Sequence, residues 1–212
     1  MSRWKLLALA ATLVLGAAGW ALAPAVSFAS AVPSPSDSDV PNCLIACPQG
    51  ELLYQVVVRD LAHNPILGSN VTLDFAACPT FPYCGPTRAP YDVDPTNRRF
   101  SRTTGVGGVV DFNLALRGTC GNITVAVFAD GVLLKQVRLA LMDQNGDGAV
   151  GSDDAAIATG KIGGGDRSAD VDCSGSITAA DISIIVAHSG HECPLPTPTP
   201  RSSWGTLKIH YR

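Results

Sequence analysis

The sequence predicts a mainly β protein: an antiparallel β-sandwich followed by a small α domain with two loop-helix repeats. Apolar and polar residues alternate in short segments between residues 54 and 139, which is the pattern of strands with one buried face. Glycine, proline and Asp-Gly turn signals separate these segments. Two short helix-like stretches follow, each directly after a loop rich in acidic residues. Five or more short strands in about 100 residues favour a sandwich.

Residues 1–31 are predicted to be a cleaved secretory signal peptide. Two basic residues, Arg3 and Lys5, precede an apolar run from Leu6 to Leu22, and Ala29-Ser30-Ala31 offers a small-residue cleavage site. The apolar run is also near the lower length limit for a membrane span, so an uncleaved anchor is the alternative. Cleavage would leave a secreted chain, extracellular or at the cell surface, with no stable membrane span.

The β-sandwich domain is predicted to cover residues 42–141, behind a Pro/Ser linker at 32–41. An insertion at 77–97 carries five prolines and two cysteines, and is either a binding loop or a disulfide-pinned surface loop without a ligand. The alternating segments that predict the strands are YQVVVR (54–59), VTLDF (71–75), VDFNL (110–114), ITVAV (123–127) and VLLKQVRL (132–139).

Three stretches of this domain carry a resemblance. VVVRDLAHNPILGSNVTLDF (56–75) combines a strand, an Asn-Pro turn and a second strand. TTGVGGVVDFNL (103–114) has a threonine-rich strand and a glycine turn, and NITVAVFADGVLL (122–134) has a closing hairpin. Together they resemble the bacterial Ig-like domains of invasins and adhesins over residues 51–139. The resemblance implies an Ig-like sandwich.

Two twelve-residue loops, DQNGDGAVGSDD (143–154) and DVDCSGSITAAD (170–181), share one pattern of oxygen side chains. These stand at positions one, three, five and twelve, and glycine stands at position six, where a sharp turn needs positive φ. Ca²⁺ takes six to eight oxygen ligands, so the pattern predicts two calcium sites. The expected ligands are Asp143, Asn145, Asp147, Asp154 and the carbonyl of Ala149 in the first loop, and Asp170, Asp172, Ser174, Asp181 and the carbonyl of Ser176 in the second.

Two further expectations concern the loops. The second site should be the weaker one, because Ser174 replaces a carboxylate at position five. Position eight is apolar in both loops, as Val150 and Ile177, which favours a short β-contact between the two loops.

The segments around the loops differ from a true EF-hand, in which helices both enter and leave each loop. A strand-like run precedes Asp143, and Gly163–Gly165 exclude a helix before Asp170. Only the leaving helices are predicted, at about 152–161 and 179–188. This plan, over 143–188, resembles the dockerin family, and we place the domain at 142–193.

The dockerin resemblance implies a calcium-dependent module that docks onto a cohesin-like or other extracellular scaffold protein, often in machinery for polysaccharide breakdown. Many dockerins carry a Ser-Thr pair at loop positions ten and eleven. This chain has Ser152-Asp153 and Ala179-Ala180 there, which leaves the partner open.

Seven cysteines agree with export, because disulfides persist in oxidising compartments. Cys173 lies inside the second loop and Cys193 follows its helix, so we expect a bridge between them. The other five cannot all pair with one another, so one is free or joins another chain. Zinc fits the cysteine spacing poorly, because the chain has no C-x₂-C pair.

No catalytic constellation is present in the sequence, so a non-enzyme is predicted. The pattern G-x-S-x-G is absent, and no histidine lies near a nucleophile motif. His188 and His191, with Glu192 and Cys193, make a weak transition-metal candidate because Gly190 interrupts the helix. Without residues 1–31 the net charge changes from −3 to about −5, which offers no basic surface for nucleic acid.

The leading hypothesis is therefore a secreted, non-catalytic modular protein that mediates extracellular or cell-surface assembly. One alternative is a carbohydrate-binding accessory subunit of a polysaccharide-degrading complex, with Phe81, Tyr83 and Tyr91 as its only aromatic cluster. Another is a calcium-rigidified surface adhesin. The Pro-rich segment 194–200 should be an extended spacer, and the tail 201–212 is an added strand, an export and anchoring signal, or a frayed end.

Overall fold

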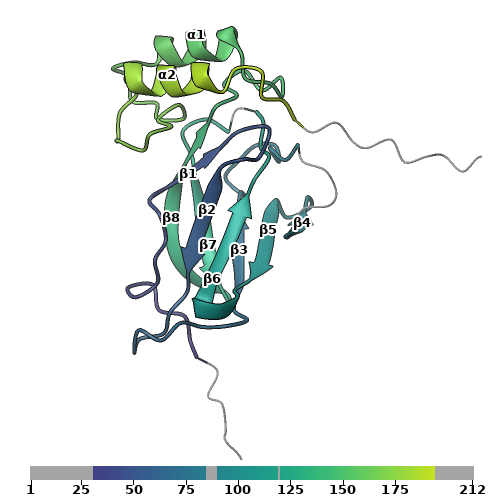
Figure 1. The fold of residues 1–212 in the computed structure, drawn as a ribbon, viewed down its shortest axis with the longest axis vertical. Helices are drawn as coiled ribbons and strands as arrows, with labels where there is room; N and C mark the ends of the chain where they lie inside the picture. Colours follow the sequence, from purple (N-terminus) through teal and green to yellow (C-terminus); the bar gives the residue numbers. More distant parts are fainter. Residues whose placement is uncertain (1–30, 85–89, 119, 194–212) are drawn as a thin grey trace, which may run out of the picture. The chain divides into compact units, whose positions relative to one another are not determined.

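The computed structural model describes residues 31–84, 90–118 and 120–193. The signal peptide, the Pro-rich segment and the tail therefore lie outside the described residues, apart from Ala31. The described chain is mainly β with two helices (Figure 1). Its strands are β1 (Cys43–Ala46), β2 (Leu53–Val57), β3 (Asn70–Asp74), β4 (Asp92–Asp94), β5 (Arg99–Thr103), β6 (Val109–Asn113), β7 (Thr124–Ala129) and β8 (Val132–Leu141). A 3₁₀ turn covers Val106–Gly108, and the helices are α1 (Ser152–Gly160) and α2 (Ala179–Ala187).

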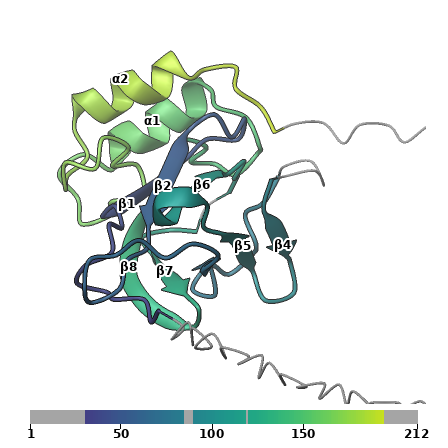
Figure 2. The ribbon, with the colours of Figure 1, turned by 60° about the horizontal axis from the view of Figure 1, so that its bottom comes forward.

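The strands form two sheets. Six strands follow the order β1-β8-β7-β3-β5-β4, and β2 pairs with β6 in a separate two-stranded sheet. The pairs are antiparallel except β1 with β8, which is parallel. In Figure 2, β1 and β4 lie at opposite edges of the large sheet. All five predicted strands are present as β2, β3, β6, β7 and β8.

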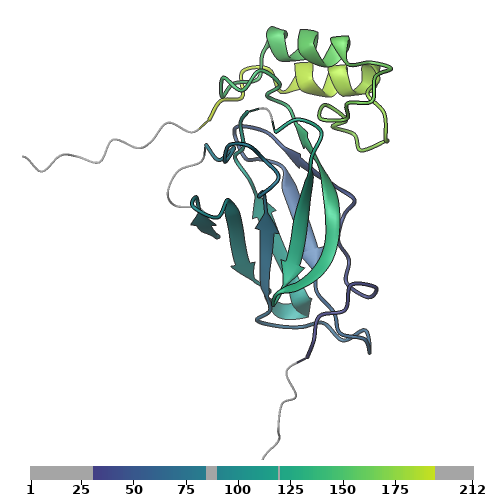
Figure 3. The ribbon, with the colours of Figure 1, turned by 180° about the vertical axis from the view of Figure 1, so that it is seen from behind.

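The turn between β7 and β8 shows why the sequence marked a hairpin there. Asp130 (φ 47°) and Gly131 (φ 82°) both take positive φ, which is the backbone of a two-residue type I′ turn and explains the Asp-Gly pair. β8 is ten residues long and carries the chain from this hairpin to the first acidic loop (Figure 3).

One apolar core takes buried side chains from both sheets. β2 and β6 contribute alternate residues, among them Val56 and Phe112, and β3 and β7 do the same from the large sheet. β8 departs from the alternation, since it buries Leu134, then Val137, and then three consecutive residues from Leu139. The period-two pattern therefore predicted the buried face of β2, β3, β6 and β7 correctly.

Phe100 of β5 forms the aromatic centre of this core. Its ring centroid lies 4.9 Å from that of Phe81, 5.3 Å from Tyr83 and 5.6 Å from Tyr91. The three aromatic residues of the insertion thus cluster as expected, but they pack onto the core rather than forming an exposed row. The disulfide Cys78–Cys120 closes the start of this insertion onto the chain before β7.

Three strands had no alternating pattern to predict them, namely β1, β4 and β5. β1 is only four residues long and pairs with the final strand, far along the chain. The expected linker at 32–41 also contacts the β-sheet: Asp39 and Val57 exchange backbone hydrogen bonds of 2.8 and 3.0 Å. Pairing with distant strands, rather than local periodicity, gives these segments their structure.

The disulfides correct one prediction. Cys173 and Cys193 do not pair with each other: Cys173 bonds to Cys43, and Cys193 bonds to Cys84. All seven cysteines lie within the described residues, and Cys47 is the unpaired one that the odd count required.

A second apolar cluster lies where β1 and β8 meet the loop-helix segment. It combines Ala140 and Met142 at the end of β8 with side chains such as Val150, Ile177 and Ile185. Residues on both sides of position 141 therefore share one cluster. Two of the three disulfides join the same two parts of the chain.

Candidate metal centres

Each acidic loop ends at the start of a helix, as the sequence predicted. The observed helices α1 and α2 match the predicted ranges to within one residue. The twelfth loop residues, Asp154 and Asp181, occupy the first turns of these helices and are buried. A carboxylate at this place accepts free backbone N–H groups and interacts favourably with the positive end of the helix.

Loop 1 (143–154) and loop 2 (170–181) repeat the same hydrogen bonds at the same positions. All of them run from a backbone N–H to a side-chain oxygen that the calcium pattern requires. The backbone N–H of position six donates to the carboxylate of position one, at 2.9 Å from both Gly148 and Gly175. The N–H of position five donates to the side chain of position three, at 2.8 Å from Asp147 and 2.9 Å from Ser174. The carboxylate of position twelve accepts from the N–H of position three (Asn145, 3.0 Å; Asp172, 3.1 Å) and, through its other oxygen, from the N–H of position nine (Gly151, 2.7 Å; Thr178, 2.8 Å).

The backbone of the two loops repeats as well. Position six has φ of 91° at Gly148 and 99° at Gly175, so the glycines are needed there. Position four is also left-handed, at Gly146 (φ 83°) and Cys173 (φ 59°). Two segments with little identity outside their ligand positions therefore adopt the same backbone turn.

Loop 2 brings its carboxylates together. Asp170, Asp172 and Asp181 each offer an oxygen within 4.8 Å of the others. The two remaining expected ligands are also close together, because the Ser174 hydroxyl donates a hydrogen bond to the Ser176 carbonyl at 3.1 Å. All five expected ligands of loop 2 thus lie in one turn of chain. Hydrogen bonds from the backbone and hydroxyl of Ser174 lower the pKa of Asp172, which keeps its carboxylate ionised.

Asp170 has an unsatisfied oxygen. Its Oδ2 accepts from Gly175 N–H at 2.9 Å and pairs with the guanidinium of Arg138. Its Oδ1 is buried and has no hydrogen-bond partner among the described residues. A buried oxygen without a partner costs about 1–3 kcal/mol, and a cation bound beside it would remove that cost. The donor set of loop 2 therefore fits a hard divalent cation.

Loop 1 satisfies more of its oxygens from its own backbone. The buried Asp143 accepts from Gly146, Gly148 and Gly118, at 2.6, 2.9 and 3.3 Å. Burial is the largest influence on Asp143 and raises the pKa of its carboxyl. Asn145 donates its side-chain amide to Asp147 at 2.9 Å, and both side chains are exposed. The expected weakness of loop 2 relative to loop 1 stays a prediction.

The expected β-contact between the two loops was wrong. Val150 N–H donates to the carbonyl of His191 at 2.9 Å, and Gly190 N–H donates to the Val150 carbonyl at 2.8 Å. The segment that leaves α2 therefore occupies the edge that Ile177 was expected to use. Val150 and Ile177 meet only as side chains of the shared apolar cluster.

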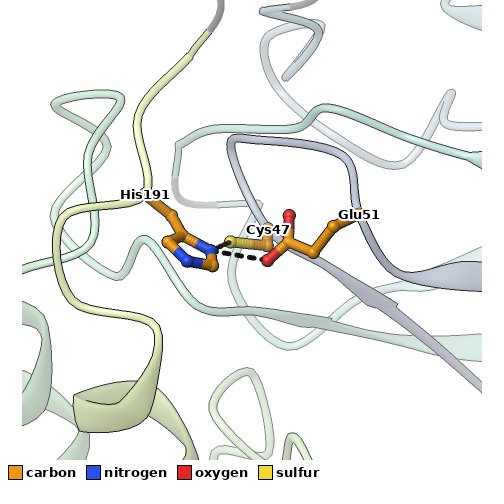
Figure 4. A group of neighbouring side chains, drawn as sticks. All are labelled: Cys47, Glu51 and His191. Atoms are coloured by element: carbon orange, nitrogen blue, oxygen red, sulfur yellow. Dashed lines mark hydrogen bonds and ion pairs between the residues drawn. The ribbon is translucent and has the colours of Figure 1, made fainter.

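A second group of candidate ligands was missed by the sequence reasoning. Cys47, Glu51 and His191 offer ligand atoms within 4.8 Å of one another, although more than 130 residues separate Glu51 from His191 (Figure 4). His191 Nδ1 lies 3.6 Å from Cys47 Sγ and 2.7 Å from Glu51 Oε1. Of the group considered from sequence, Cys193 is in a disulfide and is no longer available. The odd cysteine count was the signal that one thiol is left over, but its neighbours follow only from the fold.

The electrostatics of this group depend on burial. Burial raises the pKa of the Cys47 thiol to about 12, so the thiol is neutral and a poor nucleophile at ordinary pH. Burial would also raise the pKa of Glu51. Hydrogen bonds from its own backbone N–H, from Cys47 and from His191 outweigh that effect and lower the pKa of Glu51.

No family model matches the chain, and comparison with the curated proteins and with the solved structures found no match. Three disulfides indicate that the protein folds in an oxidising compartment. Within the part of the chain that the structure describes, no helix has the length and apolar character needed to cross a membrane.

Proposed function

We propose that this chain is an exported, non-catalytic protein in which a dockerin-like module binds two calcium ions and mediates assembly outside the cell. The observation that carries the proposal is the repeated loop, with its matched hydrogen bonds and the unpartnered Oδ1 of Asp170. The ligand positions and the backbone turn are the same in both repeats, and every expected ligand atom is an oxygen. A duplicated turn of this kind is typical of a site that an ion holds together.

The chemistry of the donors favours calcium over other ions. The expected ligands of both loops are oxygens, from carboxylates, an amide, a hydroxyl and backbone carbonyls. Oxygen-only sites with several carboxylates suit hard cations, whereas transition metals favour nitrogen and sulfur. Mg²⁺ retains several waters and demands a near-octahedral shell, which twelve-residue loops with this many protein oxygens do not require.

Calcium would stabilise the region where the loops, helices and β8 meet. Position eight of each loop places an apolar side chain in the shared cluster, and position twelve lies in the first turn of a helix. Calcium that binds the folded loops only would stabilise the fold by about 2.7 kcal/mol at a free concentration 100 times the Kd.

The arrangement of strands supports the Ig-like part of the proposal. An Ig-like sandwich sets strands C, F and G in one sheet and strands B and E in the other. Here β3, β7 and β8 are adjacent in the large sheet, and β2 and β6 form the small one. The chain departs from antibody domains in its disulfides, none of which joins β2 to β7.

The surface offered to a partner includes the first turns of both helices. Ser152, Asp153, Ala179 and Ala180, at loop positions ten and eleven, are all exposed. These are the positions through which the dockerin resemblance implies contact with a cohesin-like or other extracellular scaffold protein. In this chain the first pair is polar and acidic, whereas the second pair is two small apolar residues, so a partner's surface would have to match both.

The test is isothermal titration of the calcium-free full chain with calcium. We expect two ions per chain, and no binding by the double variant Asp143→Ala with Asp170→Ala. The chain is then immobilised, and the cell-surface proteins that it retains in calcium are compared with those that it retains in EGTA. Normal titration by the double variant would refute the calcium sites, and a partner retained equally in EGTA would refute calcium-dependent docking.

A calcium-rigidified adhesin is the second candidate. Two disulfides and a shared apolar cluster join the loop-helix segment to the β-sheets, as in a stiff rod rather than a tethered docking module. In the retention experiment this candidate predicts that calcium changes the stability of the chain but recovers no scaffold protein.

A further inference from the structure

Four potential metal ligands from distant parts of the chain converge beside the calcium module. Cys47 follows β1, and Glu51 precedes β2. His188 ends α2, and His191 lies three residues further on. We propose that Cys47, Glu51 and His191 (Figure 4), with His188 as the fourth ligand, form a Zn²⁺ site distinct from the two calcium loops.

The distances suit a tetrahedral ion after small movements. Zn–S and Zn–N bonds of about 2.3 and 2.0–2.1 Å at a tetrahedral angle place the two ligand atoms about 3.5 Å apart. Cys47 Sγ and His191 Nδ1 lie 3.6 Å apart. Glu51 Oε1 is 2.7 Å from His191 Nδ1, a hydrogen-bond distance that would lengthen when an ion replaces the proton.

His188 turns one ring nitrogen, Nε2, toward Glu51 of the site. Its Nδ1 lies 2.8 Å from the Ile184 carbonyl, which only accepts hydrogen bonds. Nδ1 must therefore carry the proton, which leaves a lone pair on Nε2 of the neutral ring. That Nε2 lies 3.7 Å from Glu51 Oε1, and the two imidazole rings lie 5.1 Å apart. A histidine ligand whose other nitrogen donates to a backbone carbonyl is the usual arrangement in metal sites.

The ligand atoms of this site favour a different ion from the one that the two acidic loops favour. One sulfur, two nitrogens and one carboxylate oxygen suit Zn²⁺, which takes cysteine, histidine and carboxylate ligands in tetrahedral sites. Cys47 itself is fully buried, whereas the side chains of Glu51 and His191 are about 30% exposed. Water and ions can therefore approach from the Glu51 side, which provides an entry path.

Hydrogen bonding alone does not explain why Cys47 is kept as a free thiol. Six of the seven cysteines are in disulfides, and Cys47 alone stays reduced beside a histidine. A nucleophilic role is disfavoured because the thiol is fully buried. On binding Zn²⁺ the thiol would lose its proton, form an S–Zn bond and release the proton to solvent.

A bound ion would link the turn between β1 and β2 to the segment that leaves α2. The same segment pairs with Val150 of loop 1 through Gly190 and His191. Zinc would therefore stabilise loop 1 from its edge without sharing a ligand with it.

The experiment uses Co²⁺ as a spectroscopic probe of the full chain, with calcium present in excess to occupy the loops. We expect one Co²⁺ per chain, a thiolate-to-cobalt charge-transfer band in the near ultraviolet and intense tetrahedral d–d bands. Zn²⁺ should displace the Co²⁺ and abolish these bands. No reductant is added, because the disulfides must stay intact.

Variants assign the ligands. Cys47→Ser should abolish the charge-transfer band, and His188→Gln should weaken Zn²⁺ binding at least about tenfold. His63→Gln is the matched control, because His63 is an exposed histidine that pairs with Asp37 and should leave binding unchanged. If Cys47→Ser does not fold, His191→Gln takes its place and should remove the tetrahedral bands.

Absence of a charge-transfer band in the unmodified chain, or an unchanged band in Cys47→Ser, would overturn the proposal. Either result would leave the four side chains as a hydrogen-bonded cluster only. The calcium proposal would be unaffected, since its titration depends on loop residues alone.

Discussion

Replacing Asp172 by asparagine separates a calcium ligand from an ordinary surface carboxylate. Asp172 is exposed, and its Oδ1 accepts from Ser174 N–H at 2.9 Å. Asparagine keeps that hydrogen bond through its own Oδ1 and keeps the size of the side chain, but it removes one negative charge. It also places at position three of loop 2 the residue type that loop 1 has there, Asn145.

The predicted effect changes sign with calcium. Without calcium, Asp172 is close to the carboxylates of Asp170 and Asp181, all within 4.8 Å. Two like charges at 4 Å repel by about 1 kcal/mol in water, so relief of this repulsion should stabilise the exposed site by about 0–1 kcal/mol. With saturating calcium, each tenfold loss of affinity should destabilise the folded chain by about 1.4 kcal/mol, and we expect a loss of at least about tenfold.

The assay is urea unfolding of Asp172→Asn and the unmodified chain, each in EGTA and in excess calcium. Asp92→Asn is the matched control: it makes the same change at an exposed aspartate of β4, outside both loops, and should behave alike in the two conditions. If Asp172→Asn destabilises the chain equally with and without calcium, its carboxylate is not a calcium ligand and the assignment of loop 2 fails.

Gly175→Ala should destabilise the calcium-loaded chain by about 1–2 kcal/mol in urea unfolding, because an L-residue is disfavoured at φ 99°. The added methyl group itself has room, since the nearest side-chain atom lies 3.9 Å from it. Gly165→Ala, in open space without positive φ, is its control and should change stability by less than about 1 kcal/mol; equal costs would contradict the strained turn. Burial alone would raise the pKa of Asp166, but hydrogen bonds from Ser168 and the ion pair with Lys161 at 3.1 Å outweigh it and lower that pKa. Asp166 therefore contributes stability above its unfolded pKa of about 4, and loses it as the pH falls through the lower folded pKa. Asp166→Asn should cost at most about 1 kcal/mol at pH 7, given the solvent exposure of the pair, and nothing in strong acid; a cost that persists in acid denaturation series would show that the charge is not responsible.

Local patterns predicted the elements whose structure depends on nearby residues. The alternating runs gave β2, β3, β6, β7 and β8, and the Asp-Gly pair marked the hairpin between the last two. The helices followed because an acidic residue at loop position twelve lies in the first turn of each of them. A twelve-residue turn needs glycine and oxygen side chains at set places, and these can be recognised without knowing the rest of the chain.

Partners that are distant in sequence could not be predicted in the same way. The bridge of Cys173 to Cys43 joins residues 130 positions apart, and no local spacing distinguishes it from the expected bridge to Cys193. The pairing of Val150 with His191 instead of Ile177 likewise depends on where the chain returns after α2. Side-chain type shows which bonds a residue can make, but only the fold decides which partner is within reach.

By itself, the sequence determined the mainly β character, the two helices and the two acidic loops, because each depends on interactions within a few residues. The tertiary structure alone decided which cysteine stays unpaired and which residues surround it. Cys47, Glu51, His188 and His191 come together because β1 pairs with β8 in parallel and the chain after α2 returns along loop 1. These are long-range contacts, whose choice among many alternatives is made by burial of the whole core rather than by any local pattern.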